Sequence, residues 1–108
     1  MMFKQGEIII VPFPFSDLSS IKNRPVLIIS KSNNSEDIIT CGITSNLKDS
    51  KNSVLIDDSS LEYGKIPKKS LIKVDKLFTL DKSIVKKKVA RVNKETFNQV
   101  KKVLDSLF

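Results

Sequence analysis

The chain has 108 residues, of which 40% are hydrophobic and 29% charged, the composition of a single globular domain over residues 1–108. It contains no histidine and one cysteine, Cys41, so histidine-based catalysis, histidine metal sites, an internal disulfide and a cysteine-rich zinc module are excluded. No apolar run approaches the ~20 residues of a membrane-spanning helix, and we expect a cytoplasmic protein without membrane contact, bound metal or cofactor.

The net charge of +7 is unevenly distributed along the chain. Residues 1–60 carry six Lys or Arg and seven Asp or Glu, whereas residues 61–108 carry thirteen and five. A basic half beside a nearly neutral half favours a polyanionic partner, above all nucleic acid. A lysine-rich solvated surface explains the same charge equally well.

The first predicted strand is a β-branched run from Glu7 to Val11, which Pro12 ends. The segment 13–15 (Phe-Pro-Phe) is expected outside any central strand, because proline has no N–H to donate to a neighbouring strand. A polar loop is expected over residues 16–23.

The second and third predicted strands cover residues 26–30 and 38–44. Arg24 is expected at the entrance of the second strand, because a residue before proline favours extended geometry. A hairpin that places Ser30 opposite Ile38 also places Arg24 opposite Thr44, with Cβ atoms ~4.5–5.5 Å apart. We therefore expect a guanidinium and a hydroxyl to meet at one end of the sheet, although a register slip of one residue separates them.

The remaining predicted elements are a polar loop over 45–52, a short strand over 53–57, an irregular segment over 58–69, an alternating strand over 70–75 that continues over 77–80 after a kink, and a last strand over 86–92. After Asn93, a good helix N-cap, apolar residues recur at three- and four-residue steps and predict a C-terminal helix. About six short strands and one helix indicate a mainly β protein, a small antiparallel barrel with a helix packed on it.

A second polar pair lies on the predicted strand 70–75. Its alternation places Lys73 and Asp75 on one face and Ile72 and Val74 on the other. Lys73 is a candidate ligand for a phosphate, and Asp75 is a candidate proton acceptor or orienting group. An ion pair on an exposed strand explains the two residues more simply, and the sequence alone favours that interpretation.

Four segments together carry a family resemblance: Gly6–Asp17 (GEIIIVPFPFSD), Arg24–Ser30 (RPVLIIS), Ile43–Ser45 (ITS) and Ser70–Leu80 (SLIKVDKLFTL). In this order and at these spacings they resemble the MazF/PemK toxin endoribonucleases of bacterial toxin–antitoxin systems. The resemblance implies an SH3-like barrel of the CcdB/MazF type with a C-terminal helix, assembled as a homodimer. It also implies metal-independent cleavage of single-stranded RNA, typically mRNA, at short motifs, and a cognate antitoxin as protein partner.

The resemblance also implies roles for individual residues. The catalytic arginine of the family falls on Arg24, and its catalytic hydroxyl falls on Thr44. Some members use a basic residue and an aspartate at the positions of Lys73 and Asp75. Those members have arginine at the basic position, and some have a histidine before the Arg-Pro motif, so Arg24 and Thr44 carry more weight here.

A hypothetical mechanism follows from these roles, because RNA supplies its own nucleophile in the 2′-hydroxyl. Arg24 would donate two parallel hydrogen bonds to the non-bridging phosphate oxygens. Thr44 would bond the phosphate or the attacking hydroxyl, with Ser45 as a second donor. Asp75 and Asp17 are the candidates for proton removal. The expected products are a 2′,3′-cyclic phosphate and a 5′-hydroxyl.

The polar loops 15–23 and 45–51 are the expected readers of base identity, because RNA sequence is usually read on unpaired bases. The residues expected to contact RNA are Lys22, Asn23, Asn46, Lys48 and Lys73.

Three alternatives stay open. A small basic barrel can bind single-stranded nucleic acid without cleaving it. A toxin of the CcdB type inhibits a protein through its C-terminal residues, whereas the end of this chain, residues 103–108, fits helix packing. An inactive relative is a third alternative, which the presence of Arg24 and Thr44 disfavours.

Overall fold

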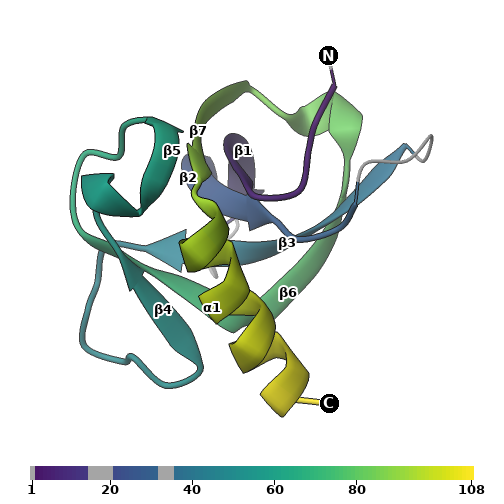
Figure 1. Cartoon of the computed structure of the whole chain (residues 1–108). Helices are drawn as coiled ribbons and strands as arrows, with labels where there is room; N and C mark the ends of the chain where they lie inside the picture. The colour runs from purple at the N-terminus through teal and green to yellow at the C-terminus, as the bar shows by residue number, and fades with distance from the viewer. Residues whose placement is uncertain (1, 15–20, 32–35) are drawn as a thin grey trace.

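The computed structural model describes residues 2–14, 21–31 and 36–108, and within these ranges seven strands form one antiparallel sheet. The strands are β1 (Glu7–Pro14), β2 (Ile21–Ile28), β3 (Asp37–Thr44), β4 (Ser53–Ile56), β5 (Leu61–Gly64), β6 (Ser70–Asp81) and β7 (Lys87–Val92). Two short 3-10 turns, η1 (Asp58–Ser60) and η2 (Lys82–Ile84), and the helix α1 (Lys94–Ser106) complete the chain. The sheet, in the order β4-β6-β3-β2-β1-β7-β5, curls into an open barrel with α1 packed against β4 and β6 (Figure 1). This confirms the predicted mainly β barrel with a C-terminal helix.

Strand β1 continues through Pro12 to Pro14, so the expected end before Pro12 is wrong. Its pairing with β7 stops at Ile10, whose carbonyl accepts a hydrogen bond from the Lys86 amide (2.8 Å). Residues two apart in a strand face the same side, so Pro12 and Pro14 turn their nitrogens toward this side, where the β7 ladder has ended. No donor is required there, and both prolines fit the strand.

Strand β2 begins at Ile21, so residues 21–23 belong to the strand and not to the predicted polar loop, and Arg24 lies inside the strand, opposite Val11. Pro25 is tolerated in this position because it faces Ile10, whose carbonyl points to β7, so this pair exchanges no hydrogen bond. The pairing of β2 with β3 begins only at the next residue. The proline therefore interrupts neither ladder.

The register between β2 and β3 is the predicted one. Val26 lies opposite Gly42, and Ile28 lies opposite Thr40. The ladder does not extend to Arg24 and Thr44, because β2 stays with β1 at this end while β3 stays with β6. The expected direct opposition of these two residues is therefore not formed.

Strand β6 is one continuous strand with an irregularity in its middle. Cys41 lies opposite Leu77 and Gly42 lies opposite Lys73, so residues 74–76 form a bulge against β3. The predicted kink followed by further strand is confirmed. The segment expected to be irregular contains β5, whose residues are mostly exposed and which forms through pairing with β7.

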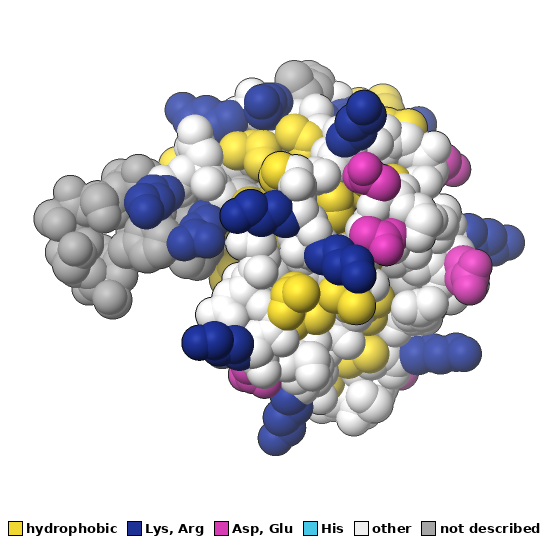
Figure 2. Space-filling view, turned by 90° about the vertical axis from the view of Figure 1, so that its left-hand side faces the viewer, with side chains coloured by type: hydrophobic (Ala, Val, Ile, Leu, Met, Phe, Trp, Pro, Cys, Tyr) yellow, Lys and Arg dark blue, Asp and Glu magenta, His cyan; other side chains and the backbone are white. Residues whose placement is uncertain are grey.

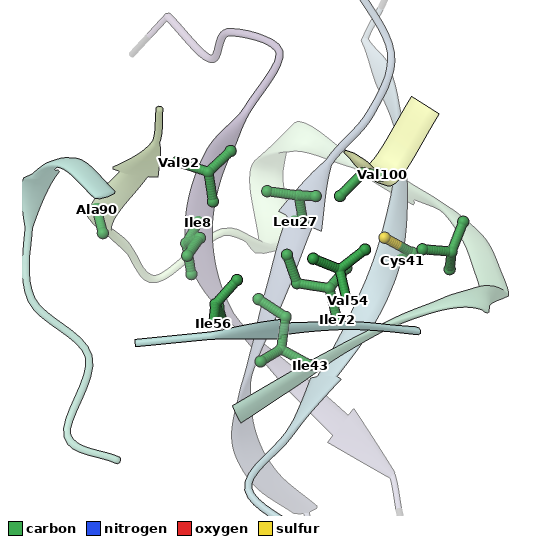
Figure 3. Close-up of a cluster of buried hydrophobic side chains, with 11 residues drawn as sticks. Ile8, Leu27, Cys41, Ile43, Val54, Ile56, Ile72, Ala90, Val92 and Val100 are labelled. Carbon is green, nitrogen blue, oxygen red and sulfur yellow. The ribbon is translucent and has the colours of Figure 1, made fainter. Parts of the chain in front are cut away.

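Buried side chains form two clusters on the two faces of the curled sheet. The cluster under the helix contains Ile8, Leu27, Cys41, Ile43, Val54, Ile56, Ile72, Val74, Ala90, Val92 and Val100 (Figure 3). The second contains Phe3, Ile9, Val11, Val26, Ile28 and Ile38. Because Ile8 and Ile9 belong to different clusters, β1 is buried on both faces. The apolar stripe predicted for the helix is also confirmed, since Asn93 caps α1 and Val100 reaches the core.

A buried carboxylate ties the N-terminal segment to three strands. Glu7 is 2% exposed, and its Oε1 accepts a hydrogen bond from the Lys4 amide (2.5 Å). Its Oε2 accepts from the Tyr63 hydroxyl (2.8 Å) and pairs with Lys88 Nζ (2.9 Å), which also donates to the Met2 carbonyl (3.0 Å). Burial raises the pKa of Glu7, but the hydrogen bonds from Lys88, Lys4 and Tyr63 outweigh it and leave this pKa below its ordinary value.

The close approach of Gly64, at the end of β5, to strand β7 provides a test of the fold. Gly64 has a φ of +85°, and a Cβ there would collide with the Val89 carbonyl oxygen and the Ala90 Cα. Gly64→Ala is expected to lower the free energy of unfolding by at least about 2 kcal/mol in urea titrations. Gly42→Ala is the matched control, because a Cβ there meets Phe78 at an ordinary 3.5 Å, and its cost should stay under about 1 kcal/mol. Equal costs for the two variants would contradict this close approach.

The Glu7 cluster predicts a pH dependence. Glu7→Gln should lower the free energy of unfolding by about 2 kcal/mol near neutral pH, because the Lys88 ammonium loses a buried anionic partner. The pKa of Glu7 is lower in the folded state, so its stabilisation is complete above the unfolded pKa of about 4.3. It is lost as the pH falls through the folded pKa. Urea titrations of both proteins should therefore differ near neutral pH and converge in acid, and a difference that persists in acid argues against the ion pair.

Candidate functional site

A basic cleft opens beside the middle of the sheet. Its volume is about 400 Å³, and its lining residues are Ile8, Ile10, Arg24, Pro25, Ile43, Ser45, Lys65, Ile66, Pro67, Lys68, Ser70, Lys87 and Val89. Among these described residues one is arginine, three are lysine and none is acidic. The cleft therefore combines apolar walls with a purely cationic set of charges, an arrangement that suits an anionic ligand with flat apolar parts.

The sheet order explains why distant segments meet here. Strand β1 lies between β2 and β7, and Ile10 is opposite Pro25 on one side and Lys87 on the other. All three of these residues line the cleft. The connection from β5 to β6, which contributes Lys65 and Lys68, lies at the left of Figure 1 and faces the viewer in Figure 2. Figure 2 shows hydrophobic patches on this face with Lys and Arg side chains around them.

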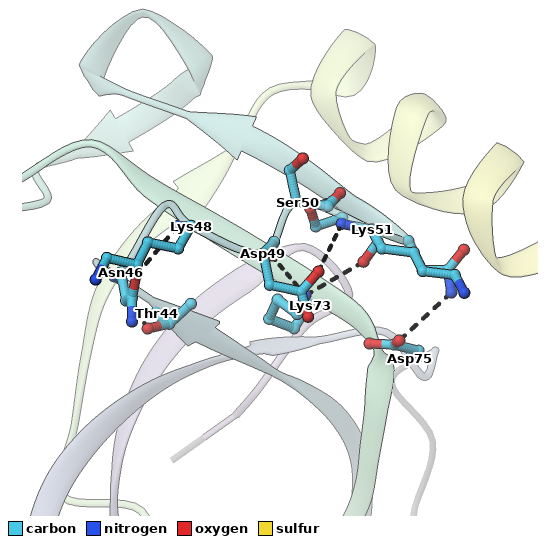
Figure 4. Close-up of polar contacts among 10 residues, drawn as sticks. Thr44, Asn46, Lys48, Asp49, Ser50, Lys51, Lys73 and Asp75 are labelled. Carbon is cyan, nitrogen blue, oxygen red and sulfur yellow. Dashed lines mark hydrogen bonds and ion pairs between the residues drawn. The ribbon is translucent and has the colours of Figure 1, made fainter.

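The loop 45–52 after β3 is shaped by side chains that cap its own amides (Figure 4). Thr44 Oγ1 accepts from the Asn46 amide (3.1 Å), and Asn46 Oδ1 accepts from the Lys48 amide (3.0 Å). Asp49 Oδ1 then accepts from the Lys51 amide (3.1 Å). Successive turns of this kind define the path of the loop, which begins at the cleft with Ser45.

Lys73 is buried beneath this loop. Its Nζ donates to the carbonyls of Asp49 (2.8 Å) and Lys51 (3.2 Å) and lies 3.7 Å from Asp49 Oδ2. The pKa of the Asp49 carboxyl is below its usual range. The main cause is the hydrogen bond from the Lys51 amide, and the second is the positive charge of Lys73. The expected ion pair on an exposed strand is therefore wrong, since Lys73 is covered by the loop and pairs with Asp49. Asp75 is exposed and accepts a hydrogen bond from Asn52 Nδ2 (3.4 Å).

Cys41 is buried on β3, and burial raises the pKa of its thiol to about 12. The thiol is therefore protonated at neutral pH and does not serve as a nucleophile. Within residues 2–14, 21–31 and 36–108, no group of three His, Cys, Asp or Glu side chains is placed to hold a metal ion. In the same part of the chain, no helix has the length and apolar character needed to cross a membrane.

The structure brings together only part of the predicted site. Arg24 and Ser45 line the same cleft. Thr44 directly precedes Ser45, and its hydroxyl accepts the hydrogen bond from the Asn46 amide at the start of the loop. Lys73 and Asp75 do not line the cleft.

The other predicted residues do not line the cleft or lie outside the described residues. Lys22 and Asn23 are exposed on β2, and Asn46 and Lys48 are exposed in the loop 45–52. Asp17 and Phe15 lie outside the described residues.

Four polar residues of the cleft are not among the predicted site residues: Lys65, Lys68, Ser70 and Lys87. Lys87 belongs to the dense basic run 86–88, which was the available signal. Its position beside Arg24 follows from the pairing of both β2 and β7 with β1, and this pairing joins residues more than sixty positions apart.

Solved structures share this fold. MazF from Deinococcus radiodurans has a TM-score of 0.77 at 18% identity, covering 99% of this chain and 96% of its own. An endoribonuclease from a mycobacterial species has a TM-score of 0.74 at 19% identity, covering 96% and 88%. A mycobacterial endoribonuclease in complex with its cognate antitoxin has a TM-score of 0.75 at 19% identity, covering 96% and 92%. The TM-scores establish the MazF-like barrel as the fold of this chain, although the sequence identities are low.

Sequence comparison gives the family. No curated protein matches the chain significantly. Residues 4–108 match the model of the PemK-like, MazF-like toxins of type II toxin–antitoxin systems. Because this match spans nearly the whole chain and agrees with the fold, the protein belongs to the PemK-like, MazF-like toxin family of type II toxin–antitoxin systems.

Proposed function

We propose that the protein is a sequence-specific, metal-independent endoribonuclease that cleaves single-stranded RNA, above all mRNA, as the toxin of a toxin–antitoxin pair. The observation that carries the proposal is the cleft in which Arg24 lies with three lysines and no described acidic residue. Such a cleft attracts a polyanion and can stabilise negative charge that develops on a phosphate. Family membership and structural relatives described as endoribonucleases support RNA as that polyanion.

The proposed reaction is a transesterification. The 2′-oxygen forms a bond to the adjacent phosphorus, and the bond from phosphorus to the 5′-oxygen breaks. A base takes the proton of the 2′-hydroxyl, and the leaving 5′-oxygen gains a proton, so the products are a 2′,3′-cyclic phosphate and a 5′-hydroxyl. Arg24 donates hydrogen bonds to the non-bridging oxygens, and Ser45 adds a hydroxyl to the cleft. Asp17 and Asp75 are candidates for the base, although Asp75 does not line the cleft.

The lysines of the cleft extend this site along the RNA. Lys65, Lys68 and Lys87 line the same cleft as Arg24 and would bind the phosphates on either side of the cleaved one. Asn23 and Asn46 are exposed and directly precede or follow the cleft residues Arg24 and Ser45 in sequence, and they would contact bases.

Two protein partners belong to the proposal. A structural relative has been solved with its cognate antitoxin, and a MazE–MazF complex is known from Deinococcus radiodurans. We expect an antitoxin here as well, as an acidic segment that folds onto the basic surface. We also expect the protein to form a homodimer, which light scattering of the purified protein tests directly.

Arg24→Ala tests the proposed catalytic step. The purified variant, in EDTA, should cleave a long unstructured RNA at least about 100-fold more slowly, because a donor to the developing phosphate charge is lost. Binding to a non-cleavable 2′-deoxy analogue should weaken far less. The control is Arg91→Ala, since Arg91 forms a surface ion pair with Glu62 (3.7 Å) and does not line the cleft.

Mapping the ends of the cleaved RNA distinguishes the alternatives. Cyclic phosphate ends at a recurring short motif support the proposal, whereas 3′-hydroxyl and 5′-phosphate ends contradict its chemistry. Binding without any cleavage by the wild type would favour the non-catalytic barrel. Absence of both would favour a toxin of the CcdB type that inhibits a protein.

Replacing the three cleft lysines together tests the path of the RNA. The variant Lys65→Ala/Lys68→Ala/Lys87→Ala should raise KM more than it lowers kcat. The slope of log affinity against log salt should fall by about 2, at about 0.7 per lost contact with a single strand. The matched control, Lys94→Ala/Lys101→Ala/Lys102→Ala, removes the same charge from exposed positions of α1. An equal change in both variants would mean that only net charge matters.

A further inference from the structure

The loop 45–52 crosses over β6 instead of lying beside it. Strands β3 and β4 are both antiparallel to β6 and lie on its two sides, so they run parallel to each other. Gly42 of β3 and Ser53 of β4 both pair with Lys73. The chain leaves β3 at Thr44, opposite Leu71, and has to return over β6 before β4 begins. Parallel strands of one sheet need such a crossover, and this one has only eight residues.

Lys73 lies under the crossover and points into it. Its neighbours Ile72 and Val74 are fully buried in the core under α1, and side chains alternate along a strand, so Lys73 lies on the opposite face. This lysine is only 8% exposed, and its ammonium donates to two carbonyls of the loop, so the loop covers it. Figure 4 shows Lys73 below Asp49 and Lys51, with the dashed contacts between them.

The Lys73 ammonium is engaged with the loop on several sides. Two of its three N–H donors serve the carbonyls of Asp49 and Lys51. The Asp49 carboxylate lies 3.7 Å away as an ion-pair partner. A phosphate would have to replace the loop in order to reach this ammonium. The cluster therefore suits a structural cation inside the loop better than a ligand for RNA.

Asp75 anchors the same loop at its far end. Its Oδ2 accepts from Asn52 Nδ2 (3.4 Å), and the Asn52 carbonyl accepts from the Val74 amide (3.0 Å). Asn52 has a φ of +54°, an uncommon conformation for a non-glycine residue that these bonds hold. Both residues of the predicted pair on β6 thus contact the crossover, one at its middle and one at its end.

We propose that Lys73 is a positioning residue of the proposed active site. It holds the crossover against β6 and thereby places Ser45, which begins the loop, at the cleft with Arg24. Lys73 itself does not contact RNA. The inference rests on the proposed ribonuclease function for its effect on cleavage, but its effect on the loop is independent of that function.

Lys73→Met tests the proposal, with Lys76→Met as the matched control on an exposed position of the same strand. Hydrogen exchange of the RNA-free protein reports on the loop through the amides of Asn46, Lys48 and Lys51, which donate within it. In Lys73→Met these amides should exchange at least about 10-fold faster, and in Lys76→Met they should not change. RNA cleavage should fall by about 100-fold in kcat, because Ser45 loses its fixed position.

Salt dependence separates positioning from direct contact. With a 2′-deoxy analogue, the slope of log affinity against log salt should be the same in Lys73→Met and the wild type. A lysine that binds a phosphate would lower this slope by about 0.7 when it is removed. Lys73→Arg keeps donors for the same carbonyls, so it should retain slow exchange and at least about a tenth of the activity.

Three outcomes overturn the proposal. One is loss of cleavage in Lys73→Met with unchanged loop exchange, and another is a reduced salt slope, since both indicate direct contact with RNA. The third is unchanged exchange together with unchanged cleavage. If Lys73→Met does not fold, Lys73→Arg decides by the same measurements. If the wild-type protein does not cleave RNA, the proposed function fails. The exchange experiment still tests whether Lys73 holds the loop 45–52 against β6.

Discussion

Strand β1 is the element on which the rest of this structure depends. It is buried on both faces, because Ile8 and Ile9 belong to different clusters, and it is paired on both edges from Ile8 to Ile10. A strand that is packed on both faces and hydrogen-bonded on both edges has little freedom to shift its register, since a slip of one residue exchanges its two faces. The rigid frame therefore places β2 and β7 on its two sides, and with them Arg24 and Lys87.

The buried carboxylate of Glu7 adds a polar constraint to this hydrophobic frame. Four groups converge on it or on its partner Lys88, and they come from the N-terminal segment, β5 and β7. A buried ion pair contributes little net stability compared with apolar packing, but it is costly to break on one side only. Its effect is to select one arrangement of these segments. Lys88 points toward Glu7, whereas its neighbour in sequence, Lys87, lines the cleft.

Features with a local cause were predictable from the sequence. The register of β2 with β3, the strand 37–44 and the helix that Asn93 caps all follow from alternation or from a capping residue. The prolines of β1 were misread because their tolerance depends on where the β7 ladder ends. Strand β5 was missed because its mostly exposed residues show no alternation.

The candidate site also contains residues that could be predicted from their own segment and residues that could not. Arg24 and Ser45 were identified from their own segments, and both line the cleft. Lys87 reaches it through the pairing of β7 with β1, and Lys65 and Lys68 through the connection that follows β5, which pairs with β7. The burial of Lys73 was equally hidden, because the residues that cover it belong to a crossover whose path depends on the sheet order. Lysine side chains thus either line the cleft or are buried beneath a loop, according to the topology of the sheet.

The two prolines at the end of β1 have a consequence for association. Beyond Ile10 the strand has lost β7 as a neighbour, and a strand edge of this kind commonly recruits an extended segment from another chain. Pro12 and Pro14 turn nitrogens without hydrogen toward this edge, so an incoming strand finds no donors at alternate positions. The edge thus resists β-augmentation and the growth of intermolecular sheets. A polypeptide that binds this part of the barrel finds only carbonyl acceptors along the edge and has to rely chiefly on its side chains.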